Sequence, residues 1–156
     1  MSDTSPILRL ADAVACRAHR GQVDKAGAPY ILHPRAVAAM VRGEDARAVA
    51  LLHDVLEDTA MTEQALQALF GPRISGAVAA MTHREGESYM DYIRRLGQDP
   101  LARAVKLADL AHNMDLSRLS RVTDADLERQ EKYRMARACL LSLEPEPLPG
   151  KNPNDP

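Results

Sequence analysis

Apolar residues recur three or four positions apart along almost the whole chain, which is the spacing of one face of an α-helix. Strand signals are missing, because the sequence has neither long alternating runs nor an Asn-Gly hairpin turn. Capping residues and glycines divide the helical pattern into segments. The sequence therefore predicts a compact all-α fold of about eight helices, over residues 5–19, from Pro34 onward, and over 45–58, 62–70, 72–81, 88–97, 99–119 and 123–143.

These helices are predicted to form one domain over residues 1–143, which is long enough to bury a core and to hold one polar cavity. The remaining residues, 144–156, contain five prolines in thirteen positions. That composition predicts a disordered tail without chemistry.

The composition of the chain disfavours two classes of binding partner, nucleic acids and anionic membranes. A net charge of −2 and a chain with one Phe, four Tyr and no Trp argue against nucleic-acid binding and against attraction to an anionic membrane. Arg9 and Asp12 interrupt the first apolar stretch and no apolar run approaches ~18 residues, so neither a signal peptide nor a membrane span is expected. Cys16 and Cys139 lie far apart among apolar residues, which predicts reduced, buried thiols in a cytoplasmic protein. The oligomeric state is left open.

Four ionisable side chains interrupt the predicted helix 45–58: His53, Asp54, Glu57 and Asp58. Burying a histidine beside three carboxylates is unfavourable unless a metal ion or a network of partners compensates. Two other apolar segments supply candidate partners, one before Pro34 and one over residues 105–113. The sequence therefore predicts a site for one divalent cation with four ligands, His33, His53, Asp54 and Asp109.

The ligand types indicate which cation fits. Nitrogen and oxygen donors without thiolate disfavour a structural zinc cage and suit Mn²⁺, Fe²⁺ or another six-coordinate ion. Such an ion polarises water, and Glu57 and Asp58, one helical turn beyond the ligands, are predicted to orient or deprotonate that water. We expect Asn113 to hold a ribose hydroxyl or a phosphate oxygen, and Lys106 to pair with a carboxylate or a phosphate.

Each feature also has a simpler explanation when it is taken alone. A His-Asp pair is most often structural or on the surface, and an aspartate such as Asp109 can pair with a buried arginine. Glu57 and Asp58 can be the solvated end of a helix, and His112 is as well explained by a satisfied core histidine as by a functional one. The agreement of three segments in residue type favours the metal site.

The same residues resemble the HD-domain phosphohydrolases, and more narrowly the hydrolase domain of RelA/SpoT-type alarmone enzymes. The small size resembles that of stand-alone alarmone hydrolases, which lack a synthetase domain. The resemblance runs from residue 11 to about residue 120 in family order, and it rests on three stretches: residues 18–22 with 25–34 (AHRGQ and KAGAPYILHP), 51–59 (LLHDVLEDT), and 105–109 with 112–114 (VKLAD and HNM).

The resemblance implies an all-α HD fold with a bound Mn²⁺ and removal of the 3′-pyrophosphate from (p)ppGpp, giving GDP or GTP and pyrophosphate. It implies that the four predicted ligands match those of the family and that Glu57 and Asp58 match its catalytic acidic pair. By the same resemblance, Asn113 contacts the ribose and phosphate region, and Lys25 lies in the loop that approaches the nucleotide.

Two departures from the family pattern put the exact substrate in question. Asp24 and Asp115 stand where the family usually carries arginine, and Arg84 with His83 is a candidate source of the missing phosphate contacts. One alternative is therefore an HD-type phosphatase acting on NADPH or a nucleoside monophosphate. The other is a nucleotide-binding regulatory module without turnover, which the retention of all six ligand and acidic residues disfavours.

Overall fold

The computed structural model of the protein describes residues 5–143, so the predicted tail 144–156 lies outside the described residues. Within 5–143 the chain forms helices and no strand, and one isolated antiparallel bridge joins Val23 to Pro29. This confirms the prediction of an all-α fold. The elements are α1 (Pro6–Ala18), α2 (Leu32–Met40), α3 (Glu44–Leu52), α4 (Val55–Asp58), α5 (Glu63–Phe70), α6 (Pro72–Ala80), α7 (Tyr89–Leu96), α8 (Pro100–Asn113), the 3₁₀ helix η1 (Leu116–Arg118) and α9 (Asp124–Ser142).

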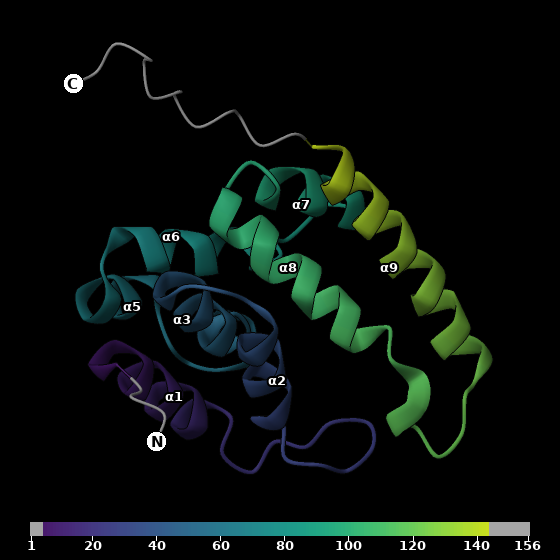
Figure 1. Ribbon diagram of the computed structural model, residues 1–156, viewed down its shortest axis with the longest axis horizontal. Helices are drawn as coiled ribbons and strands as arrows, with labels where there is room; N and C mark the ends of the chain where they lie inside the picture. Colours follow the sequence, from purple (N-terminus) through teal and green to yellow (C-terminus); the bar gives the residue numbers. More distant parts are fainter. Residues whose placement is uncertain (1–4, 144–156) are drawn as a thin grey trace.

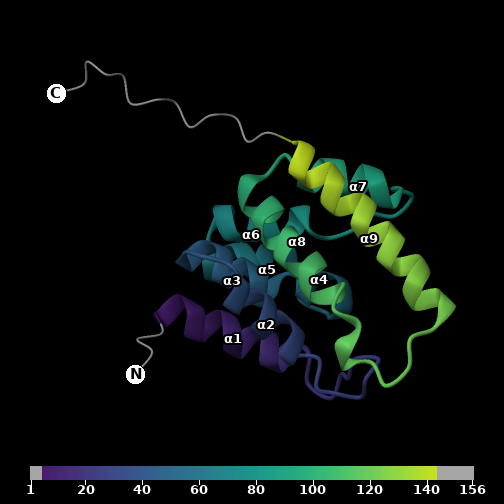
Figure 2. The ribbon, with the colours of Figure 1, turned by 45° about the vertical axis from the view of Figure 1, so that its right-hand side comes forward.

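Two helices organise the packing. The buried helix α3 contacts α1, α2, α6 and α8, and α8 runs across the molecule between this group and α9 (Figures 1 and 2). One apolar cluster fills the space between α1, α2, α3, α5, α6 and the first half of α8. A second, smaller cluster joins α7 and α9 to the second half of α8. Because α8 belongs to both clusters, its polar residues lie where the two halves of the molecule meet.

Side-chain caps start the helices where the sequence predicts them. Ser5, Thr62, Ser88 and Asp99 each accept a hydrogen bond from a backbone N–H in the first turn of the helix that follows. Thr123 forms a reciprocal capping box with Asp126 at the start of α9. Such caps satisfy backbone donors that the helix itself leaves unpaired.

The prediction of one continuous helix over residues 45–58 is wrong, and the difference matters for the site. The helix ends at Leu52, turns through His53 and Asp54, and resumes as α4. Asp54 has φ −101° and ψ −3°, which is outside ideal helical geometry. This break changes the directions in which the two side chains leave the backbone.

Two helix ends also differ from the prediction. The helix predicted over 99–119 ends at Asn113, because the Asp115 side chain accepts from the backbone N–H of Ser117 and starts a separate 3₁₀ turn. The helix predicted to begin at Pro34 begins at Leu32. Proline is tolerated there because the first turn of a helix needs no N–H donor.

No helix in the described residues is long and apolar enough to cross a membrane. Cys16 and Cys139 are free, as predicted, but both are half-buried rather than buried.

Candidate metal centre

Three segments distant in sequence bring polar side chains to one buried point. His33 comes from the first turn of α2, His53 and Asp54 from the turn between α3 and α4, and Asp109 from α8. Oδ1 of Asp109 lies 2.8 Å from Nε2 of His33 and 3.4 Å from Nε2 of His53. Oδ2 of Asp54 lies 3.1 Å from Nε2 of His53 and 4.0 Å from Nε2 of His33. The structure thus brings all four predicted ligands together.

The ring of His53 is held in one orientation by its own helix. Its Nδ1 lies 2.6 Å from the carbonyl oxygen of Ala50, and a carbonyl can only accept, so Nδ1 carries the proton. The other nitrogen, Nε2, is buried and has no hydrogen-bond partner among the described residues. A neutral imidazole in this tautomer presents the lone pair of Nε2 to the centre of the site, as a metal ligand does.

Each carboxylate at the site also has a second partner that orients it. The hydroxyl of Tyr30 donates to Oδ2 of Asp54 at 2.5 Å. Asp109 receives the ammonium group of Lys106 at 2.9 Å on Oδ2 and the side-chain amide of Asn113 at 3.1 Å on Oδ1. Partners of this kind fix the direction of ligand lone pairs and are a regular feature of metal sites.

Both carboxylates are held in the charged form. Burial works to raise the pKa of Asp54, but the neighbouring His53 and the Tyr30 hydroxyl lower it to about 2. Burial likewise opposes ionisation of Asp109, and Lys106 with the two histidines holds its pKa well below the ordinary value. Burial works to lower the pKa of His53, but the charge of Asp54 and of Asp109 raises it well above the ordinary value. The two carboxylates are therefore ionised, and they favour a positively charged group at the centre of the site.

The residues present fit a divalent cation. Ligand atoms of His33, His53 and Asp109 all lie within 4.8 Å of one another, and an oxygen of Asp54 lies beside them. The donor set contains nitrogen and oxygen but no sulfur. One of its nitrogens, Nε2 of His53, is buried and has no hydrogen-bond partner within the residues that the structure describes. This group of side chains is a possible metal site of the His/Asp type.

The predicted acidic pair is only partly described. Glu57, in α4, has an exposed side chain whose Oε1 accepts from the backbone N–H of His83 at 2.5 Å. Glu57 lines the same cavity as Asp54 and Asp109. The backbone of Asp58 closes α4, but its side chain lies outside the described part of the structure.

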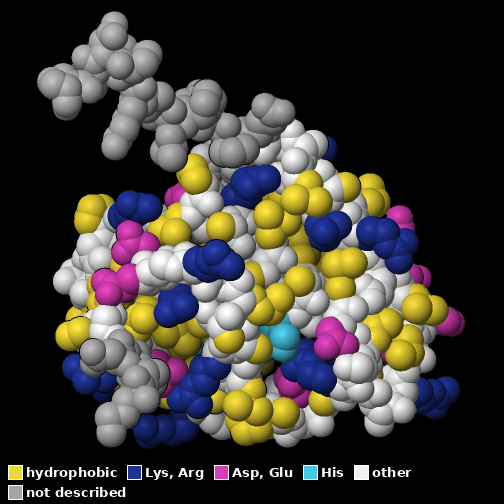
Figure 3. Space-filling model, in the orientation of Figure 1, with side chains coloured by type: hydrophobic (Ala, Val, Ile, Leu, Met, Phe, Trp, Pro, Cys, Tyr) yellow, Lys and Arg dark blue, Asp and Glu magenta, His cyan; other side chains and the backbone are white. Residues whose placement is uncertain are grey.

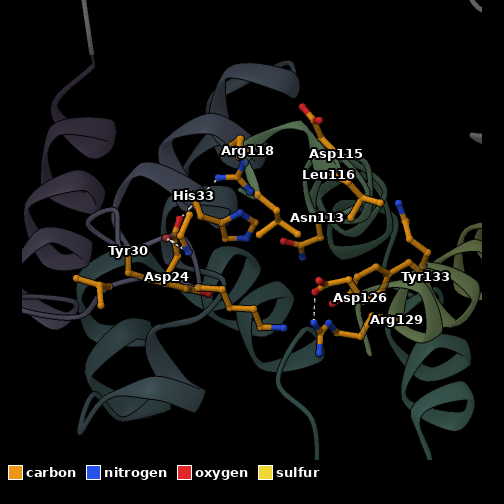
Figure 4. A pocket seen from close by; sticks show the side chains of 15 residues that line it. Asp24, Tyr30, His33, Asn113, Asp115, Leu116, Arg118, Asp126, Arg129 and Tyr133 are labelled. Atoms are coloured by element: carbon orange, nitrogen blue, oxygen red, sulfur yellow. Dashed lines mark hydrogen bonds and ion pairs between the residues drawn. The ribbon is translucent and has the colours of Figure 1, made fainter. Parts of the chain in front are cut away.

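Two neighbouring cavities open beside the predicted ligands. The first, of about 510 Å³, is lined by Asp54, Asp109 and Glu57. The second, of about 300 Å³, lies between the loop after α1 and the segment from α8 to α9 (Figure 4). The two share four lining residues: Tyr30, His33, Asn113 and Tyr133. A surface view shows a histidine flanked by acidic and basic side chains (Figure 3). The shared walls make the two cavities parts of one cleft.

The predicted substrate-binding residues are divided between these cavities. Lys106 lines the first, Lys25 lines the second and Asn113 lines both. Arg84 is exposed and is not among the residues that line either cavity, although His83 and Glu87 on each side of it line the first.

Sequence reasoning missed several residues of the cleft. Tyr30 belongs to the sequence stretch that ends at His33, but its hydrogen bond to Asp54 depends on the fold and could not be predicted from that stretch. Lys132 and Tyr133 line the first cavity and Arg129 with Tyr133 the second, all from α9. No sequence signal singles out these α9 positions, because charged residues on a helix surface are usually only solvated.

The two departures from the family pattern have structural roles. Oδ1 of Asp24 accepts from the backbone N–H groups of Ala26 and Ala28, both at 2.9 Å, so this side chain braces its own loop. Its Oδ2 lies 3.8 Å from a guanidinium nitrogen of Arg118, which also lines the second cavity (Figure 4). Asp115 caps the 3₁₀ turn described above. The guanidinium group of Arg118 thus lies near Asp24, although Arg118 belongs to a different segment of the chain.

Comparison with known proteins gives consistent matches. A profile of the HD domain matches residues 11–143. The bifunctional (p)ppGpp synthase/hydrolase SpoT of Escherichia coli is 33% identical over 153 residues, covering 88% of this chain and 21% of that protein. The guanosine-3′,5′-bis(diphosphate) 3′-pyrophosphohydrolase of Haemophilus influenzae is 36% identical over 116 residues, covering 65% of this chain and 17% of that protein. The chain thus spans about a fifth of the length of these curated relatives.

Among solved structures, one described as a metazoan ortholog of SpoT that hydrolyses ppGpp matches with a TM-score of 0.69 and 26% identity. The match covers 90% of this chain and 86% of that one. With the profile match over residues 11–143, it shows that this chain belongs to the HD-domain family and is related to the SpoT/RelA hydrolases.

Proposed function

We propose that this protein is a metal-dependent hydrolase that removes the 3′-pyrophosphate from (p)ppGpp. The observation that carries the proposal is the convergence of His33, His53, Asp54 and Asp109, with Nε2 of His53 buried and without a hydrogen-bond partner in the described part of the chain. The names of the relatives supply the substrate, since the bacterial relatives and the metazoan neighbour are described as acting on ppGpp.

Mn²⁺ is the cation we propose, with Fe²⁺ and Co²⁺ as the alternatives that share its ligand chemistry. His33, His53, Asp54 and Asp109 would hold it. When bound, such a cation withdraws charge from a phosphate oxygen and makes water easier to deprotonate.

Glu57 and Asp58 are the residues we propose to handle the water and its proton. One oxygen of Glu57 is fixed by the backbone of His83, which holds the carboxylate at the wall of the first cavity. In the reaction a water oxygen bonds to the phosphorus next to the ribose 3′ oxygen, and the bond between these two atoms of the substrate breaks. The acidic pair accepts the proton of the water, and the 3′ oxygen leaves as a hydroxyl after it takes up a proton.

The charge of the substrate is met by cationic groups along the cleft. Lys106 and Lys132 line the first cavity and Lys25 the second, so lysine ammonium groups face both ends of a bis-diphosphate nucleotide. Asn113 lines both cavities and is proposed to contact the ribose between them. A contact from Arg84 stays a prediction, because Arg84 is exposed and lines neither cavity.

The test is product analysis after incubation of the purified chain with ppGpp and Mn²⁺. We expect GDP and pyrophosphate in equal amounts, with the reaction lost on chelation and restored by adding the cation back. Glu57→Gln should reduce the rate about 10²–10⁴-fold, which is the usual contribution of a general base, while Glu85→Gln, in an exposed loop position, should not change it.

Parallel incubations with NADPH and a nucleoside monophosphate address the alternative substrates. Asp24, an acidic residue in the second cavity, is the observation that makes this comparison necessary. Faster turnover of either compound than of ppGpp would overturn the proposed substrate. Binding of ppGpp without turnover under any divalent cation would instead favour a regulatory module.

A further inference from the structure

We propose that His112 is a positioning residue for the metal ligand His33. Nδ1 of His112 lies 2.7 Å from Nδ1 of His33, and the rings come from different helices, α8 and α2. This inference rests on the cation site of the proposed function and is independent of which nucleotide is the substrate.

The geometry leaves little freedom for the ring of His33. Its side chain is buried, its Nε2 lies beside the carboxylate of Asp109, and its centroid is 4.9 Å from that of His112 with 32° between the ring planes. With one ring nitrogen directed at the ligand cluster and the other at His112, a rotation of the His33 ring would break both contacts. The contact with His112 therefore fixes the orientation of His33.

A count of protons assigns the roles of the two rings. Two nitrogens 2.7 Å apart form a hydrogen bond only when one of them carries a proton and the other does not. A histidine that gives its Nε2 lone pair to a cation keeps its single proton on Nδ1. In the cation-bound chain His33 must therefore donate from Nδ1, and His112 must accept on Nδ1 and carry its own proton on Nε2.

The same count of protons predicts that the ring protons of His33 and His112 occupy different nitrogens with and without a cation. Without a cation, Nε2 of His33 donates to Asp109 at 2.8 Å, so Nδ1 of His33 accepts and His112 donates. If Nε2 of His33 held a cation, that proton would be lost to solvent, the shared proton would lie on Nδ1 of His33, and Nε2 of His112 would be protonated from solvent. No net proton is released by the pair, and His112 supplies the acceptor that the ligand needs.

The test measures Mn²⁺ affinity by calorimetry without nucleotide, so that failure of the proposed substrate leaves it unaffected. His112→Leu removes the acceptor and should weaken Mn²⁺ binding about 10–100-fold, the usual effect of losing such a partner of a ligand. His112→Asn places a carbonyl oxygen near the position of Nδ1 and should retain most of the affinity. His83→Leu is the matched control, because His83 lines the same cavity as the ligand His33 but its ring contacts Tyr92 rather than a ligand.

The thermal unfolding of the metal-free variants separates positioning from simple packing. If His112 only fills space, His112→Leu should lower the stability of the metal-free chain and leave the Mn²⁺ affinity unchanged, and this result would overturn the proposal. Equal losses of Mn²⁺ affinity in His112→Leu and His112→Asn would also overturn it. Should His112→Leu fail to fold, nitrogen NMR of the unaltered chain with diamagnetic Zn²⁺ decides. We expect Nδ1 of His33 to be protonated and Nδ1 of His112 to be bare, and the reverse would refute the assignment.

Discussion

At the scale of single residues, the turn at His53 and Asp54 is what makes the site possible. Adjacent residues on an unbroken helix point about 100° apart, so they face one ion poorly. The helix α3 ends at Leu52, the hydrogen bond from Nδ1 of His53 to Ala50 orients the His53 ring, and Nε2 of that ring lies 3.1 Å from Asp54 and 3.4 Å from Asp109. The residue types of this pair were predictable from sequence, but the break was not, because Leu51-Leu52 and Val55-Leu56 both favour a continuous helix.

Replacing a ligand should remove the cation and the activity together. His53→Ala is expected to abolish stoichiometric Mn²⁺ binding and turnover, and Asp109→Asn to do the same. Asp109→Asn should also lower the free energy of unfolding of the metal-free chain by about 3–5 kcal/mol, because the buried ammonium of Lys106 loses its partner. Metal analysis and urea unfolding check both variants, and an active, metal-free Asp109→Asn protein would refute the site.

Replacing an acidic residue outside the ligand set should separate binding from turnover. Asp58→Asn is expected to keep Mn²⁺ affinity within about threefold and to lose about 10²–10⁴-fold in rate, since it changes proton handling rather than coordination. Calorimetry and product analysis on the same preparation measure the two effects. Loss of cation binding in this variant would show that Asp58 is a ligand, contrary to the proposed roles.

At the scale of elements, the contact between α7 and α9 leaves no room beside Gly97. A Cβ at this position would meet a methyl group of Leu143 and lie 3.2 Å from the carbonyl oxygen of Ile93. We expect Gly97→Ala to lower the free energy of unfolding by about 1–3 kcal/mol through overpacking. Denaturant unfolding measures this change.

Gly76 is the matched control for that substitution. It lies inside α6, and a Cβ there would meet nothing within 4 Å. Because glycine is unfavourable in a helix interior, Gly76→Ala should raise stability by about 0.5–1 kcal/mol. Equal effects of the two substitutions would contradict the packing described for α7 and α9.

An ion pair between Arg95 and Glu87 helps to hold the loop between α6 and α7, and it makes the free energy of unfolding depend on pH. The guanidinium of Arg95 hydrogen-bonds both oxygens of Glu87 and lowers the pKa of that carboxyl to about 2 from an ordinary 4.5. A group with a lowered folded pKa contributes its full stabilisation above the unfolded pKa and loses it as the pH falls toward the folded pKa. The contribution of Glu87 should therefore be complete above about pH 5 and fade toward pH 2.

The variant Glu87→Gln tests this pH dependence. It should unfold at a lower temperature than the original chain at pH 7, and the difference should shrink below pH 4.5 and vanish near pH 2. Glu85→Gln removes the same charge from an exposed position in that loop and should leave the unfolding curve almost unchanged. A difference that stays constant from pH 7 to pH 2 would exclude the ion pair as its cause.

At the scale of the whole molecule, the fold class and the meeting of four polar side chains followed from the sequence more directly than the cleft did. Helical periodicity and caps predicted the elements, and the residue types at 33, 53, 54 and 109 predicted that these side chains lie together. The cleft was not predictable, because it forms where α9 and the loop after α1 approach the second half of α8. Tyr133 and Arg129 line it only because the second apolar cluster docks α9 there.

The most direct test of the central claim is a titration of the metal-free chain with Mn²⁺ in which bound metal and ppGpp turnover are measured on the same samples. We predict that the rate of release of GDP and pyrophosphate rises in proportion to bound Mn²⁺ and saturates at one ion per chain. The same titration of His53→Ala should show neither binding nor turnover. Turnover by the metal-free chain, or a rate that continues to rise well beyond one ion per chain, would contradict the account.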